Sequence, residues 1–501
     1  MRRLVPTASR RTLRAIALAI LTAPAAADPD AAPWAAIAGL ESRVDLAVMI
    51  ERPTHQLASA PGQALASFVT ESGLFDGTLD AWTQLAASLR AEPHELTKRL
   101  LSQRVTVLLD PQKPTALAQP VIAPTRWAVL TDVSRDTERW VRDRLRAAPR
   151  DALPGATVLA IEDGRFRLAV IREPNAPTRL VFAPAESDEL FKNAVAFARE
   201  HANADPRPDL PDGDIVGFAN LEQTLESAPT IYWSARLTQS GWDTTLALHT
   251  AAPPAPERGI GADAFEALSR GALASLAADN PGALAQAVIS STTPAATAPN
   301  NATQPTALTL FPSRGAGPFS LQLTTRLPDR PRAPARFDEL VGTYLVPFTP
   351  DAAPADTAYD GRFPAAVRTQ SVVIRTPLLS RWLGTTANVA WRYTTTAPDA
   401  YAAVTCAPAQ DVSAADRARR AAETLESIDN PGPPLALGFI VRPAALARAL
   451  PDRPTQGPVA ALRWIEELRL TLLQPEPDAP GVSRGSMTLR TAPAQPRPPT
   501  R

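Results

Sequence analysis

The chain has 501 residues, of which 45% are hydrophobic and 20% charged, with 51 basic and 51 acidic side chains. An apolar fraction of this size lets the chain bury a large core and excludes a disordered protein. The balanced charge does not favour a nucleic acid or an anionic membrane as partner. The 53 prolines predict many short elements, because proline donates no amide hydrogen bond and interrupts helices and central strands.

The first 27 residues have the composition of a secretory signal peptide. Five arginines and no acidic residue stand among them. An apolar run covers residues 15–21, and Ala25-Ala26-Ala27 forms a small-residue cleavage site. Arg10-Arg11 also matches part of a twin-arginine motif, so both export routes stay open. We expect the mature protein to be exported, periplasmic or extracellular, after cleavage near Ala27.

No segment is predicted to span a membrane. The apolar run of the signal peptide is shorter than the roughly 20 residues that a bilayer span needs, and longer apolar stretches are interrupted by charge or proline. Cys406 is the only cysteine, so we expect no internal disulfide. It ends the strand-like segment YAAVTC, and we interpret it as a buried structural thiol.

Residues 28–205 are predicted to form an N-terminal α+β module. Apolar or alternating runs predict strands at 44–50, 104–110, 126–132, 157–162, 165–172 and 178–182. Helices are expected over 57–72, 80–90, from Glu92-Pro93 onward, over 134–148 and over 187–201. Along 134–148 the charges alternate, as in the pair Glu138 and Arg142, which indicates a self-paired solvated face.

Residues 206–290 are predicted to form a second α+β module. The segment 214–250 is typical of a short strand, a helical turn and two strands joined by a turn. Trp233 and Trp242 are expected on one dry face of these strands, and Arg236, Asp243 and His249 on a polar opposite face. Helices over 263–278 and 281–290 would cover the dry face.

A low-complexity linker or loop is expected at 291–305, followed by a C-terminal α+β module at 306–491 and a disordered tail at 492–501. Strands of this module are predicted at 307–311, 319–327, 371–375, 388–395 and 400–406. Ser413 to Asp416 form a capping box that begins a helix, and Asn430-Pro431-Gly432 ends it.

A diverged copy of the segment 214–250 occurs at 435–491. DIVGFANLEQTLESA corresponds to LALGFIVRPAALARAL, ARLT to LRLT and TTLALHT to GSMTLRT. Such self-similarity indicates an internal duplication. The predicted fold class is therefore α+β, with antiparallel sheets, helices on one face, and two or more related modules.

Two glycine-containing motifs imitate catalytic or cofactor signatures. Residues 481–485 fit the G-x-S-x-G pattern of a serine-hydrolase elbow around Ser483, but a strand is expected after it and the last histidine is His249. A hairpin turn explains the motif better. Residues 259–264 imitate a dinucleotide fingerprint, although a proline-rich segment rather than a strand precedes them.

Candidate metal ligands are equally weak. His94 begins a zinc-protease-like segment, but Lys98 stands where the second histidine must be. Asp209, Asp212 and Asp214 have oxygen ligands suited to calcium, and a solubilising linker explains them better. The remaining histidines, His55, His201 and His249, are scattered among segments, and all four histidines are expected at the surface.

The repeated succession of strand, L-x-x-L helix and β pair loosely resembles exported bacterial proteins of unknown function built from strand–helix–strand–strand units. The resemblance implies export and an α+β fold, and carries no functional residue to this chain. We predict no catalytic, cofactor-binding or metal-binding residue and no cofactor. The leading hypothesis is a non-enzymatic exported protein, structural or a binding module, with a protein or an apolar small molecule as partner. A periplasmic carrier of an apolar ligand and an exported hydrolase with a non-contiguous site stay open.

Overall fold

The computed structural model describes residues 34, 37, 39–40, 43–72, 76–110, 126–145, 150–153, 156–161, 164–172, 177–199, 210–220, 230–249, 260–278, 306–313, 319–326, 357–360, 365–373, 386–395, 401–408, 416, 420, 432–450, 457–476 and 481–493. The predicted signal peptide, the linker 291–305, the helix 281–290, most of the helix that begins at Ser413 and most of the tail lie outside these residues. The chain divides into two compact units, Met1–Ala252 with Gln456–Trp464 and Leu489–Arg501, and Pro253–Thr455 with Ile465–Thr488. The modules drawn from the sequence stay a prediction.

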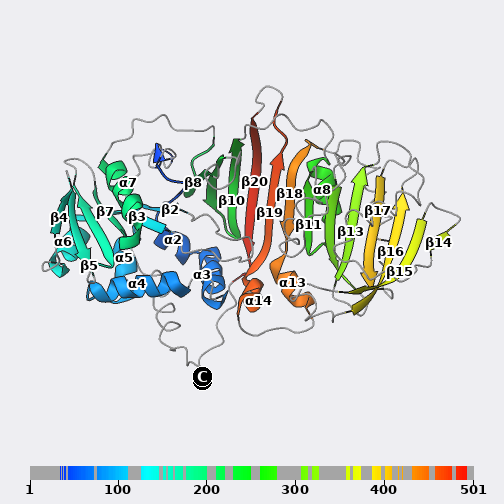
Figure 1. The fold of residues 1–501 in the computed structure, drawn as a ribbon, viewed down its shortest axis with the longest axis horizontal. Coiled ribbons are helices and arrows are strands. Elements are labelled where there is room, and N and C mark those ends of the chain that lie inside the picture. Colours follow the sequence, from blue (N-terminus) through cyan, green and yellow to red (C-terminus); the bar gives the residue numbers. More distant parts are fainter. Residues whose placement is uncertain are drawn as a thin grey trace, which may run out of the picture. The chain divides into compact units, whose positions relative to one another are not determined.

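The first unit contains a fully antiparallel sheet (Figure 1). Its strands are β1 (Leu46–Ile50), β2 (Val105–Asp110), β3 (Arg126–Val133), β4 (Arg150–Leu153), β5 (Ala156–Ile161), β6 (Phe166–Ile171), β7 (Thr178–Pro184), β8 (Ile215–Asn220), β9 (Thr230–Leu237) and β10 (Gly241–His249). They pair in the order β4-β5-β6-β7-β3-β2-β1-β8-β9-β10.

Helices of the first unit follow the apolar periodicity of the sequence. They are α2 (Pro53–Ala58), α3 (Ala60–Ser72), α4 (Asp76–Ser88), α5 (Pro93–Leu100), α6 (Arg135–Arg144), α7 (Asp188–Arg199) and α14 (Pro458–Ala461), with 3-10 turns η3 (Ala185–Ser187) and η6 (Leu462–Trp464). Proline occupies the first position of α2, α5 and α14, where its missing N–H costs nothing. The strands predicted for 44–182 are confirmed, and so are the predicted helices over their described residues, except that the helix predicted over 57–72 begins earlier and is divided at Ser59 into α2 and α3. Strand β4 was not predicted.

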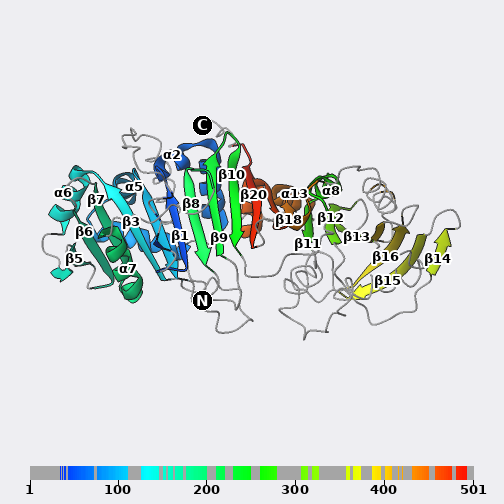
Figure 2. The same ribbon diagram turned by 90° about the horizontal axis from the view of Figure 1, so that it is seen from above.

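Both faces of the first sheet are covered. On β6, Phe166, Leu168 and Val170 pack with α4, α5 and α6, whereas Ala169 and Ile171 pack with α7. Figure 2 shows α7 and the pair α5 and α6 on opposite sides of these strands. The prediction of helices on one face only is therefore wrong for this unit. The reason is visible in β6, where five of the six residues are buried, as expected of a strand between two layers.

The β9–β10 hairpin also differs in part from its prediction. Trp233 and Trp242 share a face, because Leu246 lies opposite Trp233 and Leu237 opposite Trp242, as predicted. The indole N–H of Trp242 donates to Gln56 Oε1 at 3.2 Å. The opposite face is not a wet one, since Tyr232 and Ala247 are buried there, in the same cluster as α7.

Glu138 on α6 is a buried carboxylate held by several donors. Thr178 Oγ1 donates to it at 3.0 Å, Arg172 Nε donates at 2.8 Å, and Arg142 lies 3.6 Å away, which confirms the predicted pair with Glu138. Burial raises the pKa of Glu138, but the Arg172 and Thr178 hydrogen bonds and the arginine charges outweigh it, so its pKa lies below the ordinary value of 4.5.

We expect Glu138→Gln to lower the free energy of unfolding by about 1–3 kcal/mol at pH 7, because three donors lose a charged acceptor. A carboxyl group with a lowered pKa stabilises the fold at pH values above its ordinary pKa. This stabilisation is lost as the pH falls through the pKa of the folded state. The difference between the variant and the wild type should therefore shrink below pH 4.5. Urea unfolding at pH 7 and pH 3 measures it. Asp136→Asn, on the exposed side of the same helix, is the control, and equal losses in both variants would contradict the prediction.

The second unit contains a second antiparallel sheet. Its strands are β11 (Ala274–Ala278), β12 (Thr306–Pro312), β13 (Phe319–Arg326), β14 (Thr357–Asp360), β15 (Ala365–Val373), β16 (Thr386–Thr395), β17 (Tyr401–Pro408), β18 (Leu435–Val441), β19 (Ile465–Leu473) and β20 (Val482–Thr491), the last three residues of which belong to the first unit. They pair in the order β14-β15-β16-β17-β13-β12-β11-β18-β19-β20. Helices α8 (Ala262–Leu268) and α13 (Pro443–Ala449) complete its described part.

The predicted helix over 263–278 is wrong in its second half. Helix α8 ends at Leu268, Gly271 takes a φ of +76°, and Ala274–Ala278 form β11 between β12 and β18. A left-handed glycine ends a helix readily, and pairing on both sides outweighs the helix propensity of alanine and leucine. The predicted strand 371–375 is only the end of a longer strand, β15, and β14 was not predicted.

The two strand orders correspond position by position. Each strand of the first unit corresponds to the strand numbered ten higher at the same place in the second unit. The correspondence runs from β4 and β14, first in each order, to β10 and β20, last in each order. One backbone hydrogen bond repeats as well. Asn220 N, at the end of β8, donates to Asp45 O at 2.6 Å, and Arg442 N, after β18, donates to Leu273 O at 2.8 Å. Positions in the two units can therefore be compared through their strand registers.

Candidate functional site

Three neighbouring strands of the second unit carry a row of buried polar side chains. Ser275 on β11 lies opposite Thr309 on β12, and Thr309 lies opposite Gln322 on β13. Residues directly opposite each other in an antiparallel pair point to the same face, with Cβ atoms roughly 5 Å apart. Ser275 is 2% exposed, and Thr309 and Gln322 are 1% exposed. We call these three residues the buried polar row.

The buried polar row has unused hydrogen-bonding capacity. Ser275 Oγ, Thr309 Oγ1 and Gln322 Oε1 have no hydrogen-bond partner in the described part of the chain. The Gln322 amide nitrogen does have one, donating to Thr324 Oγ1 at 3.3 Å. A buried polar group without a partner costs about 1–3 kcal/mol, so three such groups in one row are unfavourable unless a water or a ligand supplies the missing hydrogen bonds.

The polar side of these strands is the buried one. On β12, Thr309 is buried whereas its neighbours Leu308 and Leu310 are only half-buried. On β13, Ser320 and Gln322 are buried whereas Leu321 between them is half-buried. An ordinary half-buried strand has the reverse arrangement, with its leucines inward. The polar side chains are therefore buried rather than turned toward solvent.

The first unit shows that the fold itself does not need this polarity. At the matching register of the first sheet, Ala47 on β1 lies opposite Leu108 on β2, and Leu108 lies opposite Ala128 on β3. These three residues are 0% exposed and belong to the core cluster that includes α7. The same place in an equivalent sheet is thus filled by apolar packing.

Helix α8 lies on the face that carries the buried polar row. Phe265 and Leu268 on the helix cluster with Ala277, Ala307 and Ile440, which share this face of β11, β12 and β18. A Cβ added to Gly438 would come within 2.8 Å of the Phe265 ring, so glycine lets the helix approach the sheet closely. The surroundings of the row are therefore apolar on the side of α8, β11 and β18, whereas Ser320 and Thr324 lie beside Gln322 on β13.

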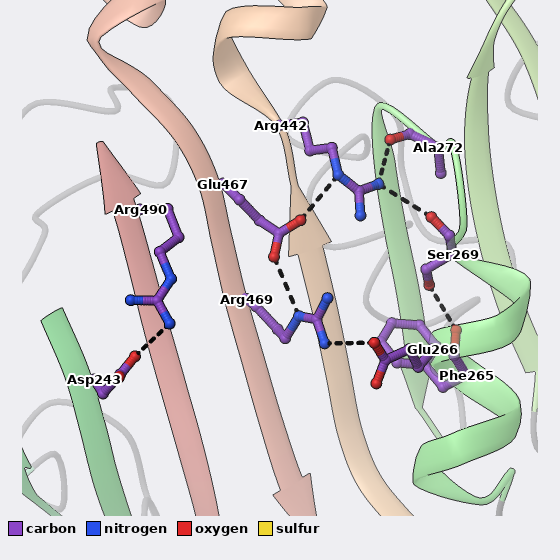
Figure 3. Close-up of polar contacts among 9 residues, drawn as sticks. All are labelled: Asp243, Phe265, Glu266, Ser269, Ala272, Arg442, Glu467, Arg469 and Arg490. Atoms are coloured by element: carbon purple, nitrogen blue, oxygen red, sulfur yellow. Dashed lines mark hydrogen bonds and ion pairs between the residues drawn. The ribbon is translucent and has the colours of Figure 1, made fainter. Parts of the chain in front are cut away.

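An ion-pair network fastens the end of α8 to the sheet, as Figure 3 shows. Arg442, directly after β18, donates from Nη1 to the carbonyl oxygens of Ser269 and Ala272 at 3.0 and 2.5 Å, and from Nε to Glu467 at 2.9 Å. Arg469 pairs with Glu467 at 3.3 Å and with Glu266 of α8 at 3.2 Å. The network joins the helix, the α8–β11 turn and two strands, and so fixes the helix on its face of the sheet.

The first unit carries a different polar group at the start of β1, the strand that corresponds to β11. Asp45 lies opposite Asp110 by the register of β1 and β2, a side-chain hydrogen bond joins the two carboxyl groups, and Asp110 lies 3.8 Å from Arg126. Burial, and then the neighbouring Asp110, raises the pKa of Asp45 above its ordinary value of 3.8. Asp45 is therefore a buried acid whose ionised form is less favourable than that of an exposed aspartate.

Asp45→Asn is expected to raise the free energy of unfolding at pH 7, because the neutral amide removes a charge that burial and Asp110 disfavour. A raised pKa stabilises the fold at low pH, and this contribution is lost as the pH rises through the folded value. The gain should therefore be largest at pH 7 and small at pH 3.5, which denaturation at the two pH values measures. A double-mutant cycle with Asp110→Asn should show coupling. A gain independent of pH would refute the carboxyl pair as its cause.

The motifs singled out in the sequence are not brought together. Ser483 lies inside strand β20 and is buried, so the strand–turn–helix geometry of a nucleophile elbow is not formed around it. Gly261 of the dinucleotide-like motif precedes α8 and bridges Pro434. Cys406 lies in β17, opposite Leu321 and Trp391.

The predicted metal candidates are likewise dispersed. His55 and His94 are exposed on α2 and α5. Asp214 Oδ2 accepts a hydrogen bond from Leu237 N at 2.7 Å, and Asp209 and His201 lie outside the described residues. His249 is not the surface residue that was predicted, because it is half-buried with its ring 5.1 Å from that of Tyr232. Within the described ranges, no three His, Cys, Asp or Glu side chains gather as a metal site would require.

Sequence reasoning missed the buried polar row. The alternation Phe319-Ser320-Leu321-Gln322 predicts a strand correctly, but its ordinary reading places Ser320 and Gln322 in solvent. A weak signal was present in β12, where Thr309 stands between Ala307 and Phe311 on one face. Only the cover over this face, which is a tertiary property, makes the row a candidate site.

Comparison with known proteins adds little. No protein-family model matches the chain, and no curated protein matches it. A solved structure titled "Structure of crystal form I of TP0453" is similar with a TM-score of 0.24 and 10% sequence identity, over 44% of this chain and 80% of that chain. A likeness of this degree carries no argument about function. None of the helices that the structure describes is long and apolar enough to cross a bilayer.

Proposed function

We propose that the protein is a non-enzymatic exported binding protein whose second unit takes up a small molecule between its sheet and the cover of the sheet. The buried polar row carries this proposal, because Ser275 Oγ, Thr309 Oγ1 and Gln322 Oε1 are buried and yet have no hydrogen-bond partner in the described part of the chain. A mostly apolar enclosed space with a few convergent polar groups is the usual form of a small-molecule site. The carrier hypothesis drawn from the sequence thus moves from the Trp233–Trp242 face to the second unit.

The tryptophan face offers less support for a ligand. The Trp242 N–H is already bonded to Gln56, and a Cβ on Gly217 would lie 2.4 Å from the Trp233 ring. Both rings are thus in contact with their own unit. The hydrolase alternative has no arrangement of described residues in its favour and stays a hypothesis.

We also propose that the two units arose from one duplicated ten-stranded unit. The equal strand orders and the repeated hydrogen bonds at Asn220 and Arg442 support this proposal. In this view the first unit kept an apolar core beneath α7, whereas the second replaced Ala47, Leu108 and Ala128 by Ser275, Thr309 and Gln322. Replacing apolar by polar residues at buried register positions lowers stability. Binding of a small molecule by the polar residues explains why the second unit has them.

Mass spectrometry of the native mature protein tests the proposed function. The protein is purified from its own host without detergent, and small molecules released by denaturation are quantified against protein. We expect one class of molecule at near-stoichiometric amounts. The double variant Ser275→Ala/Thr309→Val should release much less of it. Equal amounts from both proteins, or none from either, would count against the proposal.

A further inference from the structure

We infer that the buried polar row recognises an uncharged ligand with an apolar body and a head group that both donates and accepts hydrogen bonds, such as a primary alcohol or a primary amide. This inference rests on the proposed function and adds the chemical class of the ligand. It is drawn from the donor and acceptor capacity of the row, from the placement of charge around it and from its apolar surroundings.

The row requires a donor from the ligand. Gln322 Oε1 is a carbonyl oxygen and can only accept, so the ligand must present an N–H or O–H to it. Ser275 Oγ and Thr309 Oγ1 are hydroxyls that donate as well as accept. A head group with a donor and an acceptor close together can satisfy all three across the roughly 5 Å spacing of neighbouring strands.

The charges near this face are already engaged. Arg442 uses its guanidinium on Glu467 and on the Ser269 and Ala272 carbonyls. Ser275, Thr309, Gln322 and the described side chains beside them on β11, β12 and β13 are uncharged (Ala277, Ala307, Phe311, Ser320 and Thr324). An ionised head group would lose its hydration there without gaining a counterion, which disfavours a carboxylate or an ammonium.

The body of the ligand should be apolar. Phe265, Leu268 and Ile440 are at most 4% exposed and share the enclosed face with Ala277 and Ala307. Each methylene buried against such side chains contributes about 0.8 kcal/mol. Water is the competing occupant, because a buried water can also bond two to four polar groups, and the experiment must separate the two.

Calorimetric titration of the full-length mature protein with four probes that share an eight-carbon chain tests the inference. Octanamide and octan-1-ol carry a donor and an acceptor, methyl octanoate carries only acceptors, and octanoate is charged. We expect octanamide and octan-1-ol to bind at least tenfold more tightly than methyl octanoate and octanoate. In Ser275→Ala/Thr309→Val this preference should shrink, because two of the three groups that bond the head group are removed and only Gln322 Oε1 remains.

The same double variant has a second readout that does not need a ligand. Removal of two unpartnered hydroxyls should raise the melting temperature of the empty protein, by about 4 °C. The matched control is Ser234→Ala/Thr244→Val, which removes a buried serine and a buried threonine from β9 and β10 of the first unit. This control should leave the order of probe affinities unchanged.

The possible outcomes distinguish the inference from the function on which it rests. Equal binding of all four probes, or tightest binding of octanoate, overturns the inference while the protein remains a binding protein. Unchanged probe preference in the double variant also overturns it, because the row would then not hold the head group. Absence of probe binding together with absence of a co-purified molecule means that water fills the row, and both proposals fall.

Discussion

Phe191→Ala should lower the free energy of unfolding of the first unit by about 3–5 kcal/mol, the usual cost of removing a fully buried phenylalanine. Phe191 lies on α7, is 1% exposed, and packs into the cluster that includes Ala128, Val181 and Phe218. The stability of the Phe191→Ala variant therefore tests whether the face of the sheet beneath α7 is part of the core. Chemical denaturation followed by tryptophan fluorescence measures the loss.

Glu189→Ala on the same helix is the matched control, because Glu189 is exposed and its loss should change stability by less than about 0.5 kcal/mol. The contrast between the two variants depends on α7 lying against the sheet. If Phe191→Ala and Glu189→Ala were equally mild, the α7 face would not be a core and the one-faced sheet expected from the sequence would return.

Arg442→Ala should destabilise the second unit by about 2–4 kcal/mol, since hydrogen bonds from a charged group are worth roughly 1.5–3 kcal/mol and Glu467 loses one of its two arginine partners. The loss should be local at first. Hydrogen exchange should accelerate in α8 and in the turn around Gly271, because the carbonyls of Ser269 and Ala272 lose their donor.

Arg270→Ala removes an exposed arginine from the same turn and is the control for charge and position. It should leave exchange in α8 unchanged. If hydrogen exchange in Arg442→Ala accelerated equally across both units, Arg442 would support global stability rather than the position of α8 on the sheet. If the acceleration in Arg442→Ala is confined to α8 and its turn, octanamide affinity should fall as well. That result would connect the ion-pair network to the proposed site.

Local patterns predicted many of the elements but not their layers. Apolar periodicity located α3 to α7 and β5 to β10, because in these segments propensity, turns and burial agree. It did not reveal that the β6 face formed by Ala169 and Ile171 is covered by α7, because small and branched residues fit an exposed or a buried strand face equally well. Residues 274–278, rich in alanine, became a strand only because β12 and β18 flank them.

The repeat in the sequence pointed at related strands but not at equivalent residues. Asn220 and Arg442 make the same backbone hydrogen bond, which places Gly217 level with Phe439 rather than with Gly438. Gly217 accordingly packs against Trp233 and Gly438 against Phe265 of α8. The Gly-Phe match is thus one residue out of register, and a shift of one moves a side chain to the other face. The candidate site could not be found from the sequence because a polar residue is recognised as enclosed only when its cover is known.

The first unit is discontinuous along the chain, since Gln456–Trp464 and Leu489–Arg501 return to it after the second unit has been completed. Arg463 pairs with Glu71 at 2.9 Å, and Thr491 N donates to Ser240 O at 2.9 Å. The first unit is therefore complete only when these late segments have joined it. A single proteolytic cut at any one position cannot release either unit intact, and the two halves of this polypeptide must mature together.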